Sequence, residues 1–276
     1  MIFIIGGRGR LGQAIARQYG AHEAVCVGRA VYADCAAPEA QASIDAFLAP
    51  LAGTGATIFV AAGLLDPKLD RDAIWRVNVD LPRNIINAGI RHGVKVMTCG
   101  TVMESLLADH NPYVASKVAL GQYVAERAAA GAAVSHVRVH TLYGAGMPSP
   151  FMFLGQMLTA LEGRTPFKMT LGKQLREYHH VDDDDAAIRL LDQAGVPGVF
   201  DLSHGEPVSL AQLARTVFDA FGAPELLQVG AIPEPRDENY TTVFARHPLL
   251  AQAGFRDTLP AVVAYLAQCG AARPTK

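Results

Sequence analysis

A tyrosine and a lysine four residues apart, Tyr113 and Lys117, are the pair in this sequence best suited to chemistry. On a helix this spacing places both side chains on one face, one turn apart. An ammonium group beside a phenol favours the phenolate, so the spacing predicts a Tyr113 pKa lowered toward neutrality. Such a phenol can exchange a proton with an alcohol or a carbonyl group at physiological pH.

A glycine-rich turn near the start of the chain is suited to hold a second reactant. The apolar run Ile2–Ile5 has the pattern of a buried strand, and a helical pattern follows the turn directly. A strand that turns sharply into a helix points the free N–H groups of the first helical turn at one place, where a pyrophosphate binds. Glycines allow the tight turn and the close approach of phosphates. The residues of this turn predicted to bind a dinucleotide are Gly6, Gly7, Arg8, Gly9, Arg10, Leu11 and Gly12.

Strands and helices alternate through the first half of the chain, which predicts a parallel sheet with helices on both faces. The expected strands are Ile2–Ile5, Ala24–Val27, a short third strand before Asp34, Thr57–Ala61, Val94–Thr98 and Val134–His140. The expected helices are Arg10–Gly20, Pro38–Leu51, Asp70–His92 and Pro112–Ala130.

The pattern loosens after Gly144 into a loop rich in proline and glycine. Helices are expected over Met152–Gly163, Ala186–Ala194, Ser209–Gly222 and Leu259–Cys269, and strands over Phe167–Thr170 and Val199–Leu202. The fold class is therefore predicted to be α/β, a doubly wound parallel sheet of the Rossmann type with a smaller C-terminal substrate-binding lobe. The sheet domain is expected to comprise residues 1–146 and about 175–204, and the lobe about 147–174 and 205–276.

Composition excludes several classes of partner. The chain has 276 residues, of which 50% are hydrophobic, and a formal net charge of −2, so it can bury a full core but has no basic run for nucleic acid or an anionic membrane. No apolar stretch is long enough to span a membrane, and the early strand leaves no room for a signal peptide. The four cysteines lack metal-ligand spacing. We therefore expect a cytoplasmic protein with reduced thiols, no metal site and no nucleic-acid or membrane partner.

Two arginines indicate which nicotinamide cofactor is bound. NAD-binding units usually carry an acidic residue at the end of the second strand, where it holds the ribose 2′-hydroxyl. Here the strand is followed by Gly28 and Arg29, with no carboxylate. A guanidinium can bind a 2′-phosphate bidentately, and Arg8 is placed to reach the same phosphate from the other side. Each arginine alone could be a solvated surface charge, but together they favour NADP, with NAD as the alternative.

Further cofactor contacts are expected at the ends of the next strands. Asp34 is a candidate to meet the adenine amino group, although an ordinary turn aspartate would look the same. The small residues Ala61, Ala62 and Gly63 end a strand where the cofactor would pass. Cys35, Asn78, Tyr113 and Lys117 complete the predicted cofactor-binding set.

With these residues the chain resembles the extended short-chain dehydrogenase/reductase family, which comprises nucleotide-sugar epimerases, dehydratases and reductases. The resemblance covers almost the whole length. It is carried by Gly6–Gly12, Asn78 in a long helix, the Tyr113/Lys117 pair, and the segments 138–146, 172–183 and 199–213.

The resemblance implies hydride transfer between a nicotinamide and a sugar carbon. Tyr113 would give or take the proton on oxygen, while Lys117 tunes Tyr113 and holds the nicotinamide ribose. The family adds a serine or threonine that hydrogen-bonds the reacting oxygen. Members with a G-T-x-x-E-Y variant indicate Thr101 for this role, and Thr98 and Cys99 remain open.

The same resemblance separates the possible reactions. Dehydratases of the family carry an acidic pair directly after the catalytic threonine, where this chain has Val102 and Met103. The first turn is similar to the G-x-R-G turn of GDP-fucose synthase, an NADP-using epimerase-reductase. Together with Arg29, it favours an NADP-linked 4-keto nucleotide-sugar reductase. The alternatives are a nucleotide-sugar 4-epimerase with retained NAD, a reductase of some other carbonyl, and a non-catalytic NADP sensor, although such sensors lose the tyrosine–lysine pair.

A nucleotide sugar brings a diphosphate, so its binding lobe should offer cations. Arg176 and Arg236 lie where family members commonly place substrate contacts. Arg176 could instead pair with the acidic run 182–185, and Arg236 with a neighbouring carboxylate. His179 and His180 are expected to be structural or cleft-lining rather than catalytic. The two long helices, 70–92 and 112–130, are expected to pair with their copies in a homodimer.

Overall fold

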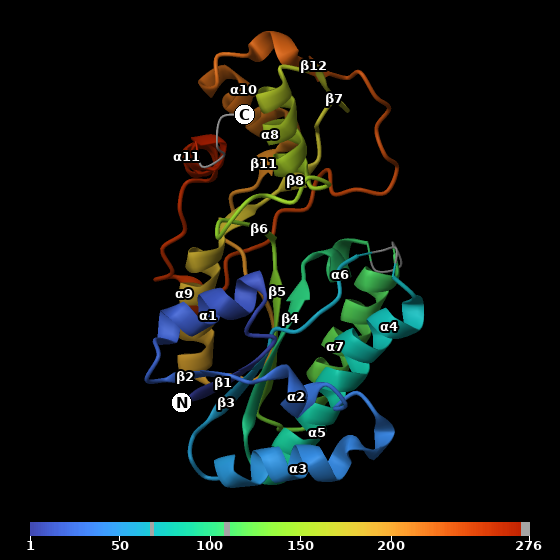
Figure 1. Cartoon of the computed structure of the whole chain (residues 1–276), viewed down its shortest axis with the longest axis vertical. Coiled ribbons are helices and arrows are strands. Elements are labelled where there is room, and N and C mark those ends of the chain that lie inside the picture. Colours follow the sequence, from blue (N-terminus) through green and yellow to red (C-terminus); the bar gives the residue numbers. More distant parts are fainter. Residues whose placement is uncertain (67–68, 108–110, 272–276) are drawn as a thin grey trace. The chain divides into compact units, whose positions relative to one another are not determined.

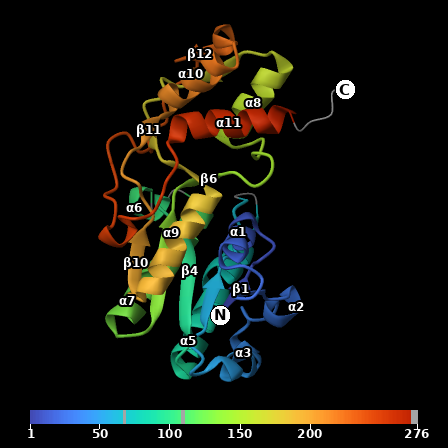
Figure 2. The same ribbon diagram turned by 90° about the vertical axis from the view of Figure 1, so that its left-hand side faces the viewer.

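The computed structural model describes residues 1–66, 69–107 and 111–271, which form two compact units (Figures 1 and 2). Of the described residues, the first unit contains those within 1–139, 184–202 and 247–253, and the second contains those within 140–183, 203–246 and 254–271. The first unit thus ends at Val139 rather than at 146 and resumes at Asp184 rather than near 175. It also takes in residues 247–253, where the sequence predicts part of the lobe.

A six-stranded parallel sheet forms the centre of the first unit, in the order β10-β5-β4-β3-β1-β2. Its strands are β1 (Ile2–Ile5), β2 (Ala24–Cys26), β3 (Thr57–Val60), β4 (Lys95–Thr101), β5 (Val134–Val139) and β10 (Gly198–Asp201). From β1 the chain goes to one side of the sheet to form β2 and then builds outward from β3 on the other side. Open α/β sheets bind ligands beyond the carboxyl ends of the strands at such a reversal of order. By this rule, a ligand is expected at the loops after β1 and β3.

Helices cover both faces of this sheet (Figure 1). On one face α1 (Arg10–Tyr19) and α9 (Val181–Ala194) lie together, and the Tyr19 hydroxyl donates a 2.7 Å hydrogen bond to Asp192. On the other face lie α5 (Leu81–His92) and α7 (Pro112–Ala129). The remaining helices of the unit are α2 (Arg29–Tyr32), α3 (Gln41–Leu48), α4 (Arg71–Trp75) and α6 (Met103–Leu106).

Local sequence explains where the long helices begin and end. Asn111 caps α7 by accepting a 3.0 Å hydrogen bond from the Val114 N–H, and Pro112 fills the first helical position, where no N–H is needed. Helix α5 ends where Gly93 adopts a left-handed φ of 64°. The sequence predicts one continuous helix over 70–92. In the structure, a π-helical turn over 76–80 separates α4 from α5. Such turns are frequent at functional sites.

Two expectations for secondary structure are wrong. The segment before Asp34 is the helical turn α2 and not a third strand, because the chain turns after Gly28 and the Val31 N–H donates to the Gly28 carbonyl at 3.0 Å. Helix α9 begins at Val181 rather than at Ala186. The acidic residues 182–185 therefore lie in its first turns, where carboxylates interact favourably with the helix dipole.

The second unit packs α8 (Phe153–Gly163), α10 (Leu210–Ala220) and α11 (Thr258–Ala271) around an apolar core that includes Met157 and Phe218. Three two-stranded sheets complete it. They pair β6 (Thr141–Tyr143) with β9 (Tyr178–His180), β7 (Phe167–Met169) with β12 (Leu227–Val229), and β8 (Leu175–Arg176) with β11 (Val208–Ser209). Among the helices of the described residues, none is both long and apolar enough to cross a bilayer.

Candidate active site

The turn between β1 and α1 can be built only from glycine at two positions. Gly6 has a φ of 87°, and a Cβ added there would lie 2.4 Å from the Ala62 amide nitrogen. A Cβ on Gly12 would lie 2.4 Å from the Gly6 carbonyl oxygen. The turn therefore packs directly on the loop after β3. Gly9 occupies the N-cap of α1 and has no side chain to cap it, so this ten-residue helix presents free N–H groups suited to a phosphate.

The arginines predicted to select the cofactor lie on the surface of the first unit. Arg8 and Arg10 are exposed within the glycine turn, beside the half-buried Leu11. Arg29 is exposed at the first position of α2, just after β2 ends. The structure thus leaves both Arg8 and Arg29 accessible to a ligand.

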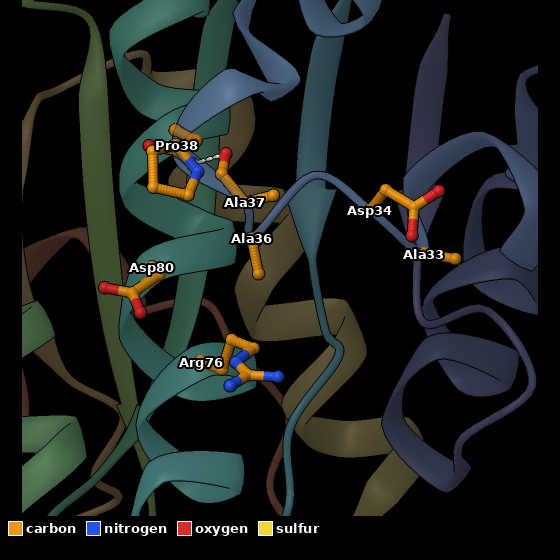
Figure 3. Close-up of a pocket in the computed structure, with 8 residues that line it drawn as sticks. Ala33, Asp34, Ala36, Ala37, Pro38, Arg76 and Asp80 are labelled. Carbon is orange, nitrogen blue, oxygen red and sulfur yellow. Dashed lines mark hydrogen bonds between the residues drawn. The ribbon is translucent and has the colours of Figure 1, made fainter.

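A pocket of about 570 Å³ lies beside Asp34 (Figure 3). Asn84 shapes the loop around it by donating hydrogen bonds to the carbonyls of Cys35 at 2.9 Å and Ala37 at 3.2 Å. The neighbouring Cys35 thiol is buried, which raises its pKa. Within the described ranges, Asp34 is the only predicted site residue among those that line the pocket. The lining consists of Ala33, Asp34, Ala36, Ala37, Pro38, Arg76, Asp80 and Asn84.

Asn78 joins the loop after β3 to helix α7. It is fully buried in the π-helical turn, where its Oδ1 accepts a 2.8 Å bond from the Leu64 N–H and its Nδ2 donates to the Leu64 carbonyl at 3.0 Å. Nδ2 also lies 3.0 Å from Ser116 Oγ, which in turn donates to the Tyr113 carbonyl at 2.6 Å. The loop that carries Ala61, Ala62 and Gly63 is therefore held against the helix that carries the tyrosine.

Lys117 is brought to the same place from the other side of that loop. Its buried Nζ donates a 2.8 Å hydrogen bond to the Cys99 carbonyl of β4, and burial lowers the pKa of Lys117. A Cβ added to Gly63 would lie 3.5 Å from both Lys117 Nζ and Asn78 Oδ1. Residues that follow β3, the π-helical turn and α7 thus meet around one small space.

The environment of Tyr113 differs from the sequence prediction in one respect. Burial raises the pKa of Tyr113, and the charge of Glu104 raises it further. The prediction that Lys117 lowers the Tyr113 pKa is wrong for the protein by itself. Desolvation of the phenol outweighs the effect of the Lys117 ammonium group, which donates to a backbone carbonyl. Tyr113 is therefore held in its neutral, proton-carrying form.

Three residues of β4 are candidates for the side chain that hydrogen-bonds the reacting oxygen. Thr98 is fully buried, and its hydroxyl donates to the Ser135 carbonyl and lies 2.7 Å from His136 Nδ1. Cys99 is also buried, which raises the pKa of its thiol to about 12. Thr101 ends the strand, is half-buried, and accepts a 3.3 Å bond from the Met103 N–H. Access therefore favours Thr101.

Sequence reasoning missed a buried pair that supports this strand end. The Glu104 carboxylate accepts a 2.7 Å bond from the Thr101 N–H and lies 3.1 Å from His136 Nε2. A Cβ on Gly100 would lie 2.1 Å from atoms of both side chains, and one on Gly121 would lie 2.6 Å from Glu104. A glycine inside a strand was the available signal, since it often marks such a close approach.

In the second unit, Arg176 has an acidic partner other than the one considered. Its guanidinium pairs with Glu238 and donates to the Leu175 carbonyl at 2.8 Å. Arg236 is exposed in the long segment after β12. Of the two, Arg236 has the more accessible side chain.

The sheet order, the glycine turn and the placement of Tyr113 and Lys117 define a Rossmann-type protein of the extended short-chain dehydrogenase/reductase class. The model of the NAD dependent epimerase/dehydratase family matches residues 2–202, and the chain belongs to this family. No curated protein matches the sequence significantly.

Several solved structures share the fold over almost the whole chain. One is TunA, a novel NAD dependent NDP-hexosamine 5,6-dehydratase involved in tunicamycin biosynthesis (TM-score 0.76, 20% identity, covering 99% of this chain and 98% of that one). Another is MoeE5 in complex with UDP-glucose and NAD (0.74, 20%, 97% and 97%). A third is the UDP-N-acetylglucosamine 4-epimerase from Methanobrevibacter ruminantium M1 (0.74, 14%, 98% and 96%). At these identities the likeness establishes the fold, and the predicted fold class is confirmed.

Proposed function

We propose that this protein is an NAD(P)-dependent oxidoreductase of a nucleotide-diphosphate sugar, specifically an NADP-linked reductase of a 4-keto sugar. The observation that carries the proposal is the fixed tyrosine–lysine pair, with Lys117 bonded to Cys99 and Asn78 bonded to Ser116 between the two. Nucleotide sugars named with the solved relatives, such as UDP-glucose, support the substrate class.

The residues present fit a dinucleotide. The turn from Gly6 to Gly12 would hold the pyrophosphate, since it leads into the N-terminus of α1, which no side chain caps. Asp34 and Cys35 would hold the adenine, Arg8 and Arg29 the 2′-phosphate, and Asn78 and Lys117 the nicotinamide end. A bound nicotinamide supplies or accepts a hydride.

Protonated Tyr113 suits the reductive direction. Its raised pKa keeps a proton on Oη at neutral pH, ready for transfer to a carbonyl oxygen as that oxygen gains negative charge. The ammonium group of Lys117 stabilises the phenolate that remains, and Thr101 Oγ1 orients the reacting oxygen. Holding these groups in place accounts for much of the expected rate acceleration.

A 4-epimerase with retained NAD is the second candidate, because the family description and the solved relatives name NAD. Dehydration is disfavoured, since Val102 is buried and Glu104 is committed to His136 and the Thr101 N–H. A non-catalytic sensor would not need the tyrosine–lysine pair. A cytoplasmic homodimer formed through α5 and α7 completes the proposal.

Two measurements separate the candidates. Mass spectrometry of ligands retained by the purified protein should find little NAD, and NADPH should be consumed with at least one member of a panel of 4-keto nucleotide sugars. Stoichiometric NAD together with interconversion of C4 epimers would overturn the reductase in favour of the epimerase. Absence of both turnover and cofactor binding would overturn the proposal that the protein is an enzyme.

A further inference from the structure

The second unit buries a cluster of one carboxylate and three imidazoles that the proposed chemistry does not use. His179 Nε2 lies 3.0 Å from Glu177 Oε2, and His204 Nδ1 lies 3.6 Å from the same oxygen. His140 Nε2 lies 3.8 Å from Glu177 Oε1. The side chains of Glu177 and His179 are at most 1% exposed, and those of His140 and His204 are 5% and 10% exposed. Three segments distant in sequence thus converge on one carboxylate.

The surroundings fix this carboxylate and keep water away from it. Ser203 Oγ donates to Glu177 at 2.7 Å, and the His204 N–H donates at 2.9 Å. The Phe255 ring packs on His179 and His204, and the Phe244 ring packs on His140. The result is a buried cluster of nitrogen and oxygen atoms with apolar rings packed against it.

Two nitrogen atoms of the cluster lack hydrogen bonds. His140 Nε2 and His204 Nε2 are buried without a hydrogen-bond partner among the residues the structure describes. Such atoms are uncommon in folded proteins and carry a free-energy penalty. His204 Nδ1 accepts a 3.1 Å bond from the Glu206 N–H two residues on, a contact that a stronger partner can replace.

We propose that Glu177, His179 and His204 bind a divalent transition-metal ion, with Zn²⁺ as the representative, beside the imidazole of His140. Ligand atoms of the first three residues all lie within 4.8 Å of one another. Tetrahedral Zn²⁺ with bonds of about 2.0 Å places its ligand atoms about 3.3 Å apart. The two separations from Glu177 Oε2, 3.0 Å to His179 Nε2 and 3.6 Å to His204 Nδ1, lie on either side of that value.

The donor set defines the class of ion. Imidazole nitrogen with one carboxylate suits Zn²⁺ and its first-row neighbours, whereas Ca²⁺ and Mg²⁺ prefer oxygen ligands. The sequence predicted no metal because positions 140, 177, 179 and 204 match no ligand spacing. The site would cross-link the second unit, and it does not depend on Tyr113 or on the proposed reaction.

The test uses the full chain without an affinity tag, in a Cys26→Ser background that removes the exposed thiol. Zn²⁺ binding is measured by calorimetry after chelator treatment, and Co²⁺ is used as an absorbing probe of coordination. His179→Phe keeps the ring that packs on Phe255 but removes both nitrogens. His204→Asn keeps an acceptor for the Glu206 N–H, as in an Asx turn. The matched control is His22→Asn, at an exposed histidine of the first unit.

We expect one Zn²⁺ per chain and a Co²⁺ spectrum typical of four-coordination. Both cluster variants should weaken binding by more than about 100-fold, since groups that merely orient a ligand are worth 10- to 100-fold. The His22→Asn protein should bind like the parent. Absence of stoichiometric binding in the parent, or equal binding by parent and by folded His179→Phe and His204→Asn proteins, would overturn the site. A cluster that only titrates with pH would appear as the first of these results.

Discussion

Each unit buries a glutamate against a histidine, and the two pairs are completed differently. In the first unit, Glu104 accepts from the Thr101 N–H and meets His136, whose other nitrogen lies 2.7 Å from the Thr98 hydroxyl. In the second unit, Glu177 is anchored equally well, but His140 and His204 each retain a buried nitrogen with no hydrogen bond to any residue that the structure describes. Backbone and hydroxyl groups complete the hydrogen bonding of the Glu104–His136 pair, which we call the closed pair, and this pair holds neighbouring residues in place. The Glu177 cluster, which we call the open pair, has further imidazoles with unbonded nitrogens and so has the properties of a metal-ligand set.

The largest effect should come from opening the closed pair. Glu104→Ala leaves His136 Nε2 and the Thr101 N–H without their partner, and loss of one member of a buried pair lowers the free energy of unfolding by about 3–5 kcal/mol. Urea denaturation measures the loss. Glu126→Ala, at an exposed position of α7, should stay within about 0.5 kcal/mol of the parent. A loss below about 1 kcal/mol in Glu104→Ala would remove the distinction between the two pairs.

The closed pair should also leave a signature in the pH profile. Burial and Glu104 raise the pKa of Tyr113, so the phenol that donates the proton in reduction stays protonated as pH rises. The rate of carbonyl reduction should then show no alkaline fall below about pH 10, the ordinary tyrosine pKa. In Glu104→Gln the fall should move to lower pH, since a negative charge has been removed. A decline already at pH 7–8 in the parent protein would show that the Tyr113 pKa is lowered instead.

The first unit alone should determine the preference between NADPH and NADH. Arg29→Asp replaces a guanidinium suited to a 2′-phosphate by a repelling carboxylate. The ratio of kcat/KM for NADPH to that for NADH should fall at least about tenfold, since a hydrogen bond to a charged group is worth about 1.5–3 kcal/mol. Steady-state kinetics with both cofactors measures the ratio. The exposed Arg215→Asp in the second unit provides the same charge change and should leave the ratio unaltered. An unchanged ratio in Arg29→Asp would refute the NADP assignment.

The smallest effect is expected at the open pair. His140→Phe replaces a buried imidazole that has an unbonded nitrogen by a ring of similar shape, packed between Phe244 and His179. Such an exchange is nearly neutral, so the free energy of unfolding in chelator should change by less than about 1 kcal/mol. A loss comparable to that of Glu104→Ala would mean that His140 is fully satisfied by the protein.

The sequence predicts best what is encoded by neighbours along the chain. Strand β1 and helix α1 were located within one residue, because an apolar run, three glycines and a helical pattern follow one another directly. The Glu104–His136 pair joins residues 32 positions apart and leaves no local pattern except Gly100. Strands of two or three residues, such as β8 and β11, are too short for a periodic signal.

Site chemistry was predictable to the same extent. Helical spacing correctly placed Tyr113 and Lys117 on one helix, α7, but spacing carries no information on burial, which decides the direction of the Tyr113 pKa. Likewise, Arg176 pairs with Glu238, 62 residues away. Pairs made by tertiary folding need the structure.

The proton on Tyr113 is the centre of the functional proposal, and one measurement tests it most directly. The rate of NADPH or NADH oxidation is compared between the parent protein and Tyr113→Phe with an accepted 4-keto nucleotide sugar, alongside the cofactor Kd of each. Loss of a general acid should lower kcat by about 10²- to 10⁴-fold while the cofactor Kd changes by less than about threefold. Comparable kcat values in the two proteins would contradict the account.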